Sequence, residues 1–306
     1  MYKIRCMMYQ VSCIPYMIKT AITSMKTGFV TIFGRSNVGK STLLNSLVGT
    51  KLAITSPKPQ TTRQQIQGVV HDPRGQIVFV DTPGIFTSSR DRLSKSLNAS
   101  AEAALKDIDV IVHVVDPTRA IGPEDKRIFS ILDKISTPKI MVINKMDMYK
   151  PTYLPFFEQE GERYNAVIKL SGKTGAHTGT LVNTIFEHLH EGQPLYAEGQ
   201  LTNMDQKFWF AELIREKLFL RLHDEVPYIL TVVVDEITQR DNGMLYLQAR
   251  ILVSSERYKR IVIGQGGRGI KEIGQSARRE LEQVTAGKVY LDLTVETDPH
   301  WMQTLA

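Results

Sequence analysis

A glycine-rich segment near the N-terminus has the residue types that a phosphate-binding loop requires. Residues 34–41 have the sequence GRSNVGKS. Glycines allow the backbone to turn so that successive N–H groups point at a β-phosphate. Lys40 then supplies a charge between the β- and γ-phosphates, and the Ser41 hydroxyl is a ligand for Mg²⁺. The apolar run 29–33 and the helical spacing of 41–47 predict a strand before this loop and a helix after it.

A second segment places a carboxylate where it can meet the same ligand. Asp81 follows the apolar run 76–80, which predicts a strand that ends at this residue. Open α/β sheets bind their ligands at the carboxyl edge. From that edge Asp81 can hold Mg²⁺, usually through water, and the N–H of Gly84 can meet a γ-phosphate oxygen.

Two later segments indicate which base is bound. Asp147, in Asn144-Lys145-Met146-Asp147, follows a predicted strand at 139–143. An aspartate there can accept the ring N–H and the exocyclic amine of guanine, a pair that adenine cannot present. The segment Ser171-Gly172-Lys173 ends a predicted strand at 166–170 and is expected to contact the base. The predicted ligand is therefore GTP or GDP rather than ATP.

Each motif alone has a plain alternative, since DTPG is an ordinary turn and NKxD recurs by chance. Four matches in order, each following a predicted strand, favour the guanine-nucleotide interpretation. The predicted nucleotide contacts are Gly34, Asn37, Val38, Gly39, Lys40, Ser41, Thr42, Asp81, Gly84, Asn144, Lys145, Asp147, Ser171, Gly172 and Lys173.

The composition is that of an ordinary globular protein. The chain has 306 residues, enough for two domains, with 42% hydrophobic and 23% charged residues. Its net charge of +6 is compatible with binding to RNA. No apolar run reaches the length of a membrane span. The only cysteines are Cys6 and Cys13, so the body of the chain has no disulfide, which fits a reducing cytoplasm.

The first 24 residues carry Lys3, Arg5 and Lys19 and no acidic residue. We interpret residues 1–24 as an upstream start or a dispensable extension, because Met25 would make a natural start. Organellar targeting is the alternative, although the segment is poor in Arg and Ser.

The remaining chain divides into two patterns. Residues 25–190 alternate strands and helices, which predicts a mostly parallel α/β sheet of the P-loop type with helices on both faces and one antiparallel pair around the turn at 71–75. Residues 191–204 contain Gly192, Pro194 and Gly199 and are interpreted as a linker. Residues 205–306 predict a smaller α+β domain in the order α-β-β-α-α-β, with helices at 206–222, 257–263 and 268–284 and strands at 228–234, 244–253 and 288–295.

A glycine turn joins the last two predicted helices. A G-x-x-G turn lets a nucleic-acid backbone approach closely, and residues 257–279 hold seven basic side chains and one acidic one. A plain helix–helix turn beside a solvated basic face is the alternative. The predicted RNA contacts are Arg260, Gly264, Gln265, Gly266, Gly267, Arg268, Lys271 and Arg278.

From residue 25 to near its C-terminus the chain closely resembles the bacterial Era GTPase family, a TRAFAC-type G domain followed by a type II KH domain. The resemblance rests on the motifs above, on Pro59-Gln60-Thr61-Thr62-Arg63, and on segments 212–217, 225–228, 263–267 and 270–274. It implies that Thr62 rather than Thr61 joins Ser41 and Asp81 as a Mg²⁺ ligand. The catalytic set that it implies is Lys40, Thr62, Asp81 and Gly84.

The same resemblance implies partners. Family members bind GTP and Mg²⁺, hydrolyse GTP slowly, and use the KH domain on the 3′ end of small-subunit ribosomal RNA during maturation of the 30S subunit. A monomeric cytoplasmic protein follows, with peripheral contact to the inner face of the cell membrane in some members.

One departure from the family, one feature shared with it and two rival interpretations remain. Gly172 stands where the family usually has alanine, and its extra chain freedom predicts slightly weaker affinity. Ile85 follows Gly84, as in the family, so no glutamine positions the attacking water and we expect slow turnover. The rivals are a regulatory GTPase that acts on a protein or membrane target through a KH-like module, and an RNA-binding protein that has lost hydrolysis.

Overall fold

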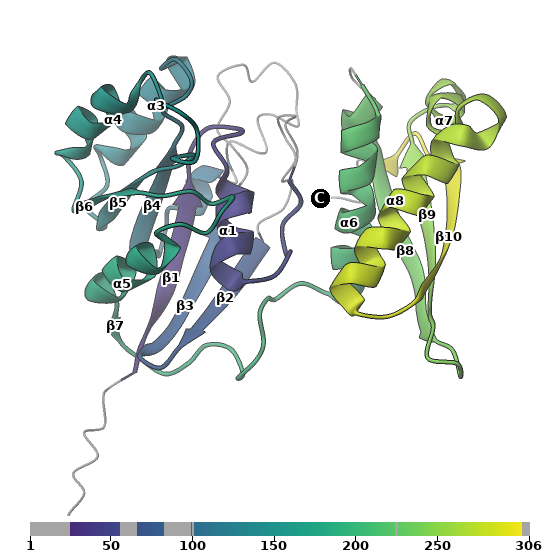
Figure 1. Ribbon diagram of the computed structural model, residues 1–306, viewed down its shortest axis with the longest axis horizontal. Helices are drawn as coiled ribbons and strands as arrows, with labels where there is room; N and C mark the ends of the chain where they lie inside the picture. The colour runs from purple at the N-terminus through teal and green to yellow at the C-terminus, as the bar shows by residue number, and fades with distance from the viewer. Residues whose placement is uncertain (1–24, 56–65, 83–98, 100, 224–225, 302–306) are drawn as a thin grey trace, which may run out of the picture.

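The computed structural model describes residues 25–55, 66–82, 99, 101–223 and 226–301. Figure 1 shows two modules, each with its own sheet, joined by one extended segment. No helix among the described residues is both long enough and apolar enough to cross a membrane.

Seven strands of the described chain form the first sheet, in the order β2-β3-β1-β4-β5-β6, with β7 paired to β1. The strands are β1 (Lys26–Phe33), β2 (Ile66–Asp72), β3 (Gly75–Asp81), β4 (Val110–Val115), β5 (Lys139–Ile143), β6 (Ala166–Lys169) and β7 (His190–Glu191). The helices around this sheet are α1 (Lys40–Val48), α3 (Pro123–Leu132), α4 (Leu154–Gly161) and α5 (Thr178–His188).

The predicted α/β class of this module is confirmed. Strands β1, β3, β4, β5 and β6 run parallel. Strand β2 pairs antiparallel with β3 as predicted, and β7 adds a second antiparallel pair with β1 that was not predicted. The turn between β2 and β3 requires a glycine, since Gly75 has φ +145° and a Cβ there would lie 1.8 Å from the carbonyl oxygen of Lys26. The hairpin predicted at 71–75 is therefore present.

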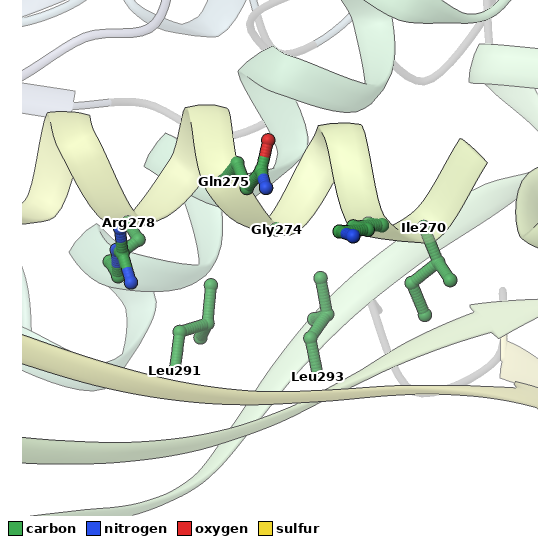
Figure 2. A pocket seen from close by; sticks show the side chains of 7 residues that line it. Ile270, Gly274, Gln275, Arg278, Leu291 and Leu293 are labelled. Carbon is green, nitrogen blue, oxygen red and sulfur yellow. The ribbon is translucent and has the colours of Figure 1, made fainter. Parts of the chain in front are cut away.

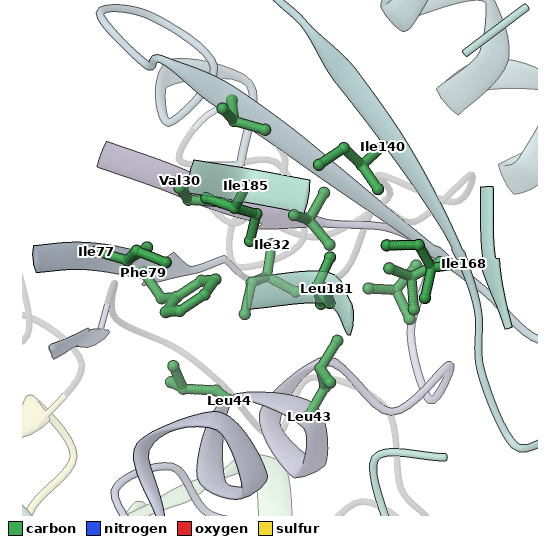
Figure 3. Close-up of a cluster of buried hydrophobic side chains, with 14 of the residues drawn as sticks. Val30, Ile32, Leu43, Leu44, Ile77, Phe79, Ile140, Ile168, Leu181 and Ile185 are labelled. Atoms are coloured by element: carbon green, nitrogen blue, oxygen red, sulfur yellow. The ribbon is translucent and has the colours of Figure 1, made fainter. Parts of the chain in front are cut away.

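Helices cover both faces of the sheet, which explains why every residue of β4 is buried and all but His113 are apolar. Val112 and Val114 lie in a core with residues of α1 and α5, as Figure 3 shows for neighbouring side chains of this cluster. Ile111 lies in a separate cluster on the other face with Ile128 of α3. A strand buried on both faces cannot alternate polar and apolar residues.

The second module has the predicted order of elements. They are α6 (Gln206–Arg221), β8 (Leu230–Gln239), β9 (Leu245–Val253), α7 (Glu256–Ile263), α8 (Arg268–Thr285) and β10 (Val289–Thr297). Strand β9 is central, parallel to β10 and antiparallel to β8. This α+β arrangement confirms the predicted fold class.

The strand predicted at 228–234 differs in its limits. Val226–Tyr228 forms a short 3₁₀ turn, because Pro227 has no N–H to give to a ladder. The strand begins at Leu230 and continues beyond Val234 through an irregularity in register between Val234 and Glu236. A bulge of this kind breaks the simple alternation that marks a strand in a sequence.

Large aromatic side chains pack in the core of this module. Phe210 lies in the core beneath the sheet, and Trp301 is buried. Trp209 packs against the same core, but its indole N–H also donates to the carbonyl oxygen of Lys51 at 2.9 Å. Helix α6 therefore belongs to the second module and also contacts the first.

The segment predicted as a linker is held against the first sheet. The Gln76 side-chain oxygen accepts from the N–H groups of Leu195 and Tyr196 at 2.8 and 2.9 Å, and its amide donates to the Tyr196 carbonyl. Further along, Thr202 forms a bridge to Gly68 of β2. These bonds give the connection a defined course toward α6.

Candidate functional site

The phosphate loop lies between β1 and α1, and its backbone needs glycine at two positions. Gly34 and Gly39 have φ +153° and +99°. A Cβ at Gly34 would lie 2.5 Å from the Val114 carbonyl oxygen, and one at Gly39 would lie 2.4 Å from the side-chain nitrogen of Asn144. Gly39 precedes α1 directly, so the N-terminus of that helix faces the loop.

The Lys40 side chain lies against the phosphate loop. Its Nζ donates to the carbonyl oxygens of Gly34 and Arg35, each at 2.9 Å. Burial lowers the pKa of Lys40 to about 8. A bound phosphate would offer this ammonium a charged partner in place of two neutral carbonyls.

Ser41 and Asp81 form the predicted metal-binding pair. The Ser41 hydroxyl donates to Asp81 Oδ2 at 2.8 Å, and Asp81 is fully buried. Burial raises the pKa of this carboxyl to about 6. Its Oδ1 is also buried and makes no hydrogen bond to a described residue. A hydroxyl beside an unsatisfied carboxylate oxygen fits the hard-oxygen preference of Mg²⁺.

Asn144 connects the phosphate loop to the base loop. Its side-chain amide donates to the Val38 carbonyl oxygen, and its side-chain oxygen accepts from the Gly172 N–H, both at 2.9 Å. Asn144 is buried. The structure therefore uses this residue to hold two loops together, a role that spacing alone did not indicate.

The rest of the predicted base loop is ordered around it. Lys145 has φ +62°, and its Nζ contacts the Asn37 carbonyl oxygen at 3.0 Å and Asp116 at 2.6 Å. Burial alone would raise the pKa of Asp116, but hydrogen bonds from Lys145 and Thr118 lower it below the usual value. The buried Asp116 therefore holds Lys145 in place, a role that the sequence did not indicate.

Asp147 is oriented by the other base loop. Its Oδ1 accepts a hydrogen bond from the Ser171 hydroxyl at 2.7 Å. A Cβ at the neighbouring Gly172 would lie 3.1 Å from Cα of Leu43 in α1, tighter than most such contacts. The glycine that departs from the family pattern thus lets the base loop approach α1 closely, in addition to any effect on chain freedom.

A cavity of about 920 Å³ borders the phosphate loop and both base loops. Its wall in the first module includes Asn37, Gly39, Thr42, Lys145 and Lys173, together with Lys51, Thr55 and Arg119. Glu216, Lys217 and Leu220 of α6 complete it from the second module. The volume is at the upper end of that of small-molecule sites and is suited to a nucleotide.

Two members of the predicted catalytic set, Thr62 and Gly84, lie outside the described residues, as does Ile85. Among the described residues, no group of three or more His, Cys, Asp or Glu side chains is arranged for a metal ion. The predicted metal site therefore consists of the Ser41–Asp81 pair, with Thr62 as an expectation.

The glycine turn of the second module lies between α7 and α8. Gly264, Gly266 and Gly267 have φ of +70°, +58° and +76°. A Cβ at Gly266 or Gly267 would meet nothing within 4 Å, so the outer side of this turn is open. Gln265 is exposed and accepts a hydrogen bond from Arg268 at 3.2 Å. The turn therefore leaves room for the predicted close approach of a nucleic-acid backbone.

Figure 2 shows a groove that runs from this end of α8 along β10. It has a volume of about 310 Å³ and is lined by Ile270, Lys271, Gly274, Gln275, Arg278, Leu291 and Leu293. Lys271 and Arg278 were predicted, whereas Arg260 and Arg268 are exposed outside this lining. The apolar floor from β10 was missed, although the alternation in residues 288–295 places Leu291 and Leu293 on one face.

Comparison with known proteins agrees with this division. A family model described as 50S ribosome-binding GTPase matches residues 29–145, and one described as KH domain matches residues 225–302. GTPase Era of Halothermothrix orenii is 42% identical over 282 residues, which cover 92% of this chain and 96% of that protein. GTPase Era of Carboxydothermus hydrogenoformans is also 42% identical, over 91% of this chain and 94% of that protein.

Two solved structures are similar over both modules. One is Era in complex with MgGDPNP and nucleotides 1506–1542 of 16S ribosomal RNA, and the other is a single-residue variant of Aquifex aeolicus Era bound to GDP·AlF₄⁻. Each has a TM-score of 0.83 and 38% identity and covers 90% of this chain and 95% of the other. With the glycine loop, the guanine loops and the second module in one chain, this protein belongs to the Era family of GTPases.

Proposed function

We propose that this GTPase uses Mg²⁺ and GTP in its first module to control RNA binding by its second. The observation that carries the proposal is the shared wall: α6, which packs in the core of the second module, also lines the nucleotide cavity. The similar Era complex holds MgGDPNP and a 16S ribosomal RNA fragment together. We infer that the partner of this chain is the 3′ end of small-subunit ribosomal RNA and that it assists 30S assembly.

The residues would act on the nucleotide as follows. Backbone N–H groups at the start of α1 and the Lys40 ammonium bind the β- and γ-phosphates. Ser41 and Asp81 hold Mg²⁺, which when bound neutralises charge that develops on the phosphates. Thr62 and Gly84 complete the proposed set on the γ-phosphate side, and Asp147 recognises guanine.

The groove of the second module suits single-stranded RNA. The open glycine turn admits the sugar–phosphate backbone, while Arg268, Lys271 and Arg278 offer exposed charges to phosphates. Leu291 and Leu293 form an apolar floor on which bases can pack. The turn therefore suits the charged phosphates of RNA, and the apolar floor suits its bases.

We also propose the domain limits that the sequence patterns predict. They are a first domain at 25–190, a linker at 191–204, a second domain at 205–306 and a dispensable extension at 1–24. A monomeric state, cytoplasmic localisation and peripheral membrane contact remain predictions of the family resemblance.

Asp147→Asn should weaken binding of GDP and of GTP analogues by about 100-fold, because an amide turns a donor toward the donors of guanine. Equilibrium titration with a fluorescent guanine nucleotide measures the effect. Asp133→Asn makes the same chemical change at an exposed carboxylate after α3, outside the phosphate and base loops, and it should leave affinity unchanged. Equal affinity in the two variants would contradict the assignment of the base site.

The raised pKa of Asp81 gives the metal site a pH dependence. Mg²⁺ needs the ionised carboxylate, so below the pKa of about 6 the ion competes with a proton. Mg²⁺-dependent binding of a GTP analogue should weaken roughly tenfold per pH unit below that value and level off above pH 7. Titration of Mg²⁺ at several pH values measures this. The same slope in Asp81→Asn would show that another group is responsible.

Replacing Arg268 and Lys271 by Gln tests the RNA groove directly. Two lost phosphate contacts should lower the slope of log affinity against log salt by about 1.4 for single-stranded RNA. The probe is a 3′-end fragment of small-subunit ribosomal RNA, with a GTP analogue present. Lys106→Gln with Lys134→Gln removes the same charge from exposed sites of the first module. An equal loss in both double variants, or salt-independent binding, would favour a protein or membrane target instead.

A further inference from the structure

Five cationic side chains of the described chain line the nucleotide cavity, and three of them already have a partner of opposite charge. The five are Lys51, Arg119, Lys145, Lys173 and Lys217. Lys51 and Lys217 both pair with Glu216, at 2.6 and 2.9 Å. Lys145 pairs with Asp116 at 2.6 Å. These three charges are therefore balanced within the protein before a ligand binds.

The other two cations of this wall are available to a ligand. Arg119 and Lys173 are exposed, and neither forms an ion pair with a described residue. Lys173 belongs to the predicted base loop, whereas Arg119 belongs to none of the predicted sets. A guanidinium offers five N–H donors in a planar fork and no acceptor, so its preferred ligand is an oxyanion such as phosphate.

The turn that carries Arg119 is fixed on one side by the base loop. It follows β4, where the buried Asp116 accepts from the Thr118 N–H at 3.0 Å and from the Thr118 hydroxyl at 2.6 Å. The other carboxylate oxygen of Asp116 accepts from Lys145 Nζ. The residue directly before Arg119 is thus held by a group that also holds the base loop.

On its other side the same turn is fixed by the phosphate loop. Arg35, the second residue of that loop, donates from Nη1 to the Ala120 carbonyl oxygen at 3.1 Å and to Asp125 Oδ2 at 2.5 Å. The same Asp125 oxygen accepts from the Gly122 N–H at 2.8 Å. Arg35 and Asp125 are both buried, so this connection is shielded from solvent. Arg119 therefore extends from a turn that is anchored to both nucleotide-binding loops.

The neighbours of Arg119 in the cavity wall indicate which part of a nucleotide it meets. They include Asn37 of the phosphate loop and Lys145 of the base loop, where Lys145 Nζ donates to the Asn37 carbonyl oxygen at 3.0 Å. A nucleotide with its β-phosphate on the phosphate loop and its base at Asp147 has its ribose and α-phosphate between these loops. Of those two groups only the α-phosphate carries a charge.

We propose that Arg119 is a nucleotide-binding residue whose guanidinium contacts the α-phosphate. The anchored turn holds the side chain at the cavity before the ligand arrives, so less backbone freedom is lost on binding. The contact is common to guanine nucleotides of any phosphate number. The inference rests on the proposed assignment of this cavity to the nucleotide.

The test is the affinity of Arg119→Gln for GMP, GDP and a non-hydrolysable GTP analogue, measured by competition with a fluorescent guanine nucleotide. All three should bind about tenfold more weakly, because each loses the same charge-assisted contact. Arg119→Lys keeps the charge without the planar fork and should lose less. Lys126→Gln removes a positive charge from an exposed side chain of α3 and should leave the three affinities unchanged.

Three results would overturn the inference. The first is unchanged affinity in Arg119→Gln, and the second is an equal loss in Lys126→Gln. The third is a loss that spares GMP, which would place the guanidinium on a different phosphate. Asp147→Asn separates this inference from the cavity assignment: if neither variant changes affinity the assignment fails too, whereas a loss in Asp147→Asn alone contradicts only the role of Arg119.

Thermal unfolding distinguishes binding from a structural role. The Arg119 side chain makes no hydrogen bond to a described residue, so Arg119→Gln without nucleotide should unfold at the same temperature as the original chain. The increase in Tm at a fixed GDP concentration should be smaller in the variant, because a ligand that binds more weakly stabilises less. A lower Tm without nucleotide and an unchanged increase with GDP would show a structural role and overturn the inference.

Discussion

The nucleotide site depends on the side-chain amide of Asn144. One end of this buried group holds the phosphate loop at Val38 and the other holds the base loop at Gly172. An amide can donate and accept at once, which neither a carboxylate nor an ammonium can do. The loops that bind the two ends of a nucleotide therefore keep a fixed separation, set by one residue at the end of β5.

The charged groups near Asn144 are arranged so that a bound ligand supplies partners of opposite charge. Lys40 is bound to loop carbonyls, and Asp81 retains a buried oxygen without a hydrogen bond to the described residues. Burial opposes the charge on both groups, lowering the pKa of the lysine and raising that of the aspartate. Phosphate and Mg²⁺ supply the opposite charges that favour the ionised forms, so binding and ionisation support each other.

Local patterns in the sequence were sufficient to predict the longer strands, the phosphate loop and the order of elements in the second module, because periodicity and glycine placement are local properties. The two-residue strand β7 was not predicted, since its pairing with β1 is a long-range contact. Local patterns also did not reveal Glu216 or the floor formed by Leu291 and Leu293. The contact of Glu216 with Thr55 joins residues 161 positions apart, and a helix that is apolar on one side gives no sign of what its other side meets. Pro227 and the irregularity after Val234 shifted the limits of β8 for reasons of backbone geometry.

In the proposed coupling, the affinity of one module for its ligand depends on the ligand of the other, and thermodynamic linkage makes that dependence mutual. The most direct test is the affinity of a small-subunit ribosomal RNA 3′-end fragment for the full chain with a GTP analogue, with GDP and with no nucleotide. We expect the tightest binding with the analogue, and its loss when Gly266 and Gly267 are both changed to Asp. Equal RNA affinity in all three nucleotide states would contradict the control of RNA binding by GTP.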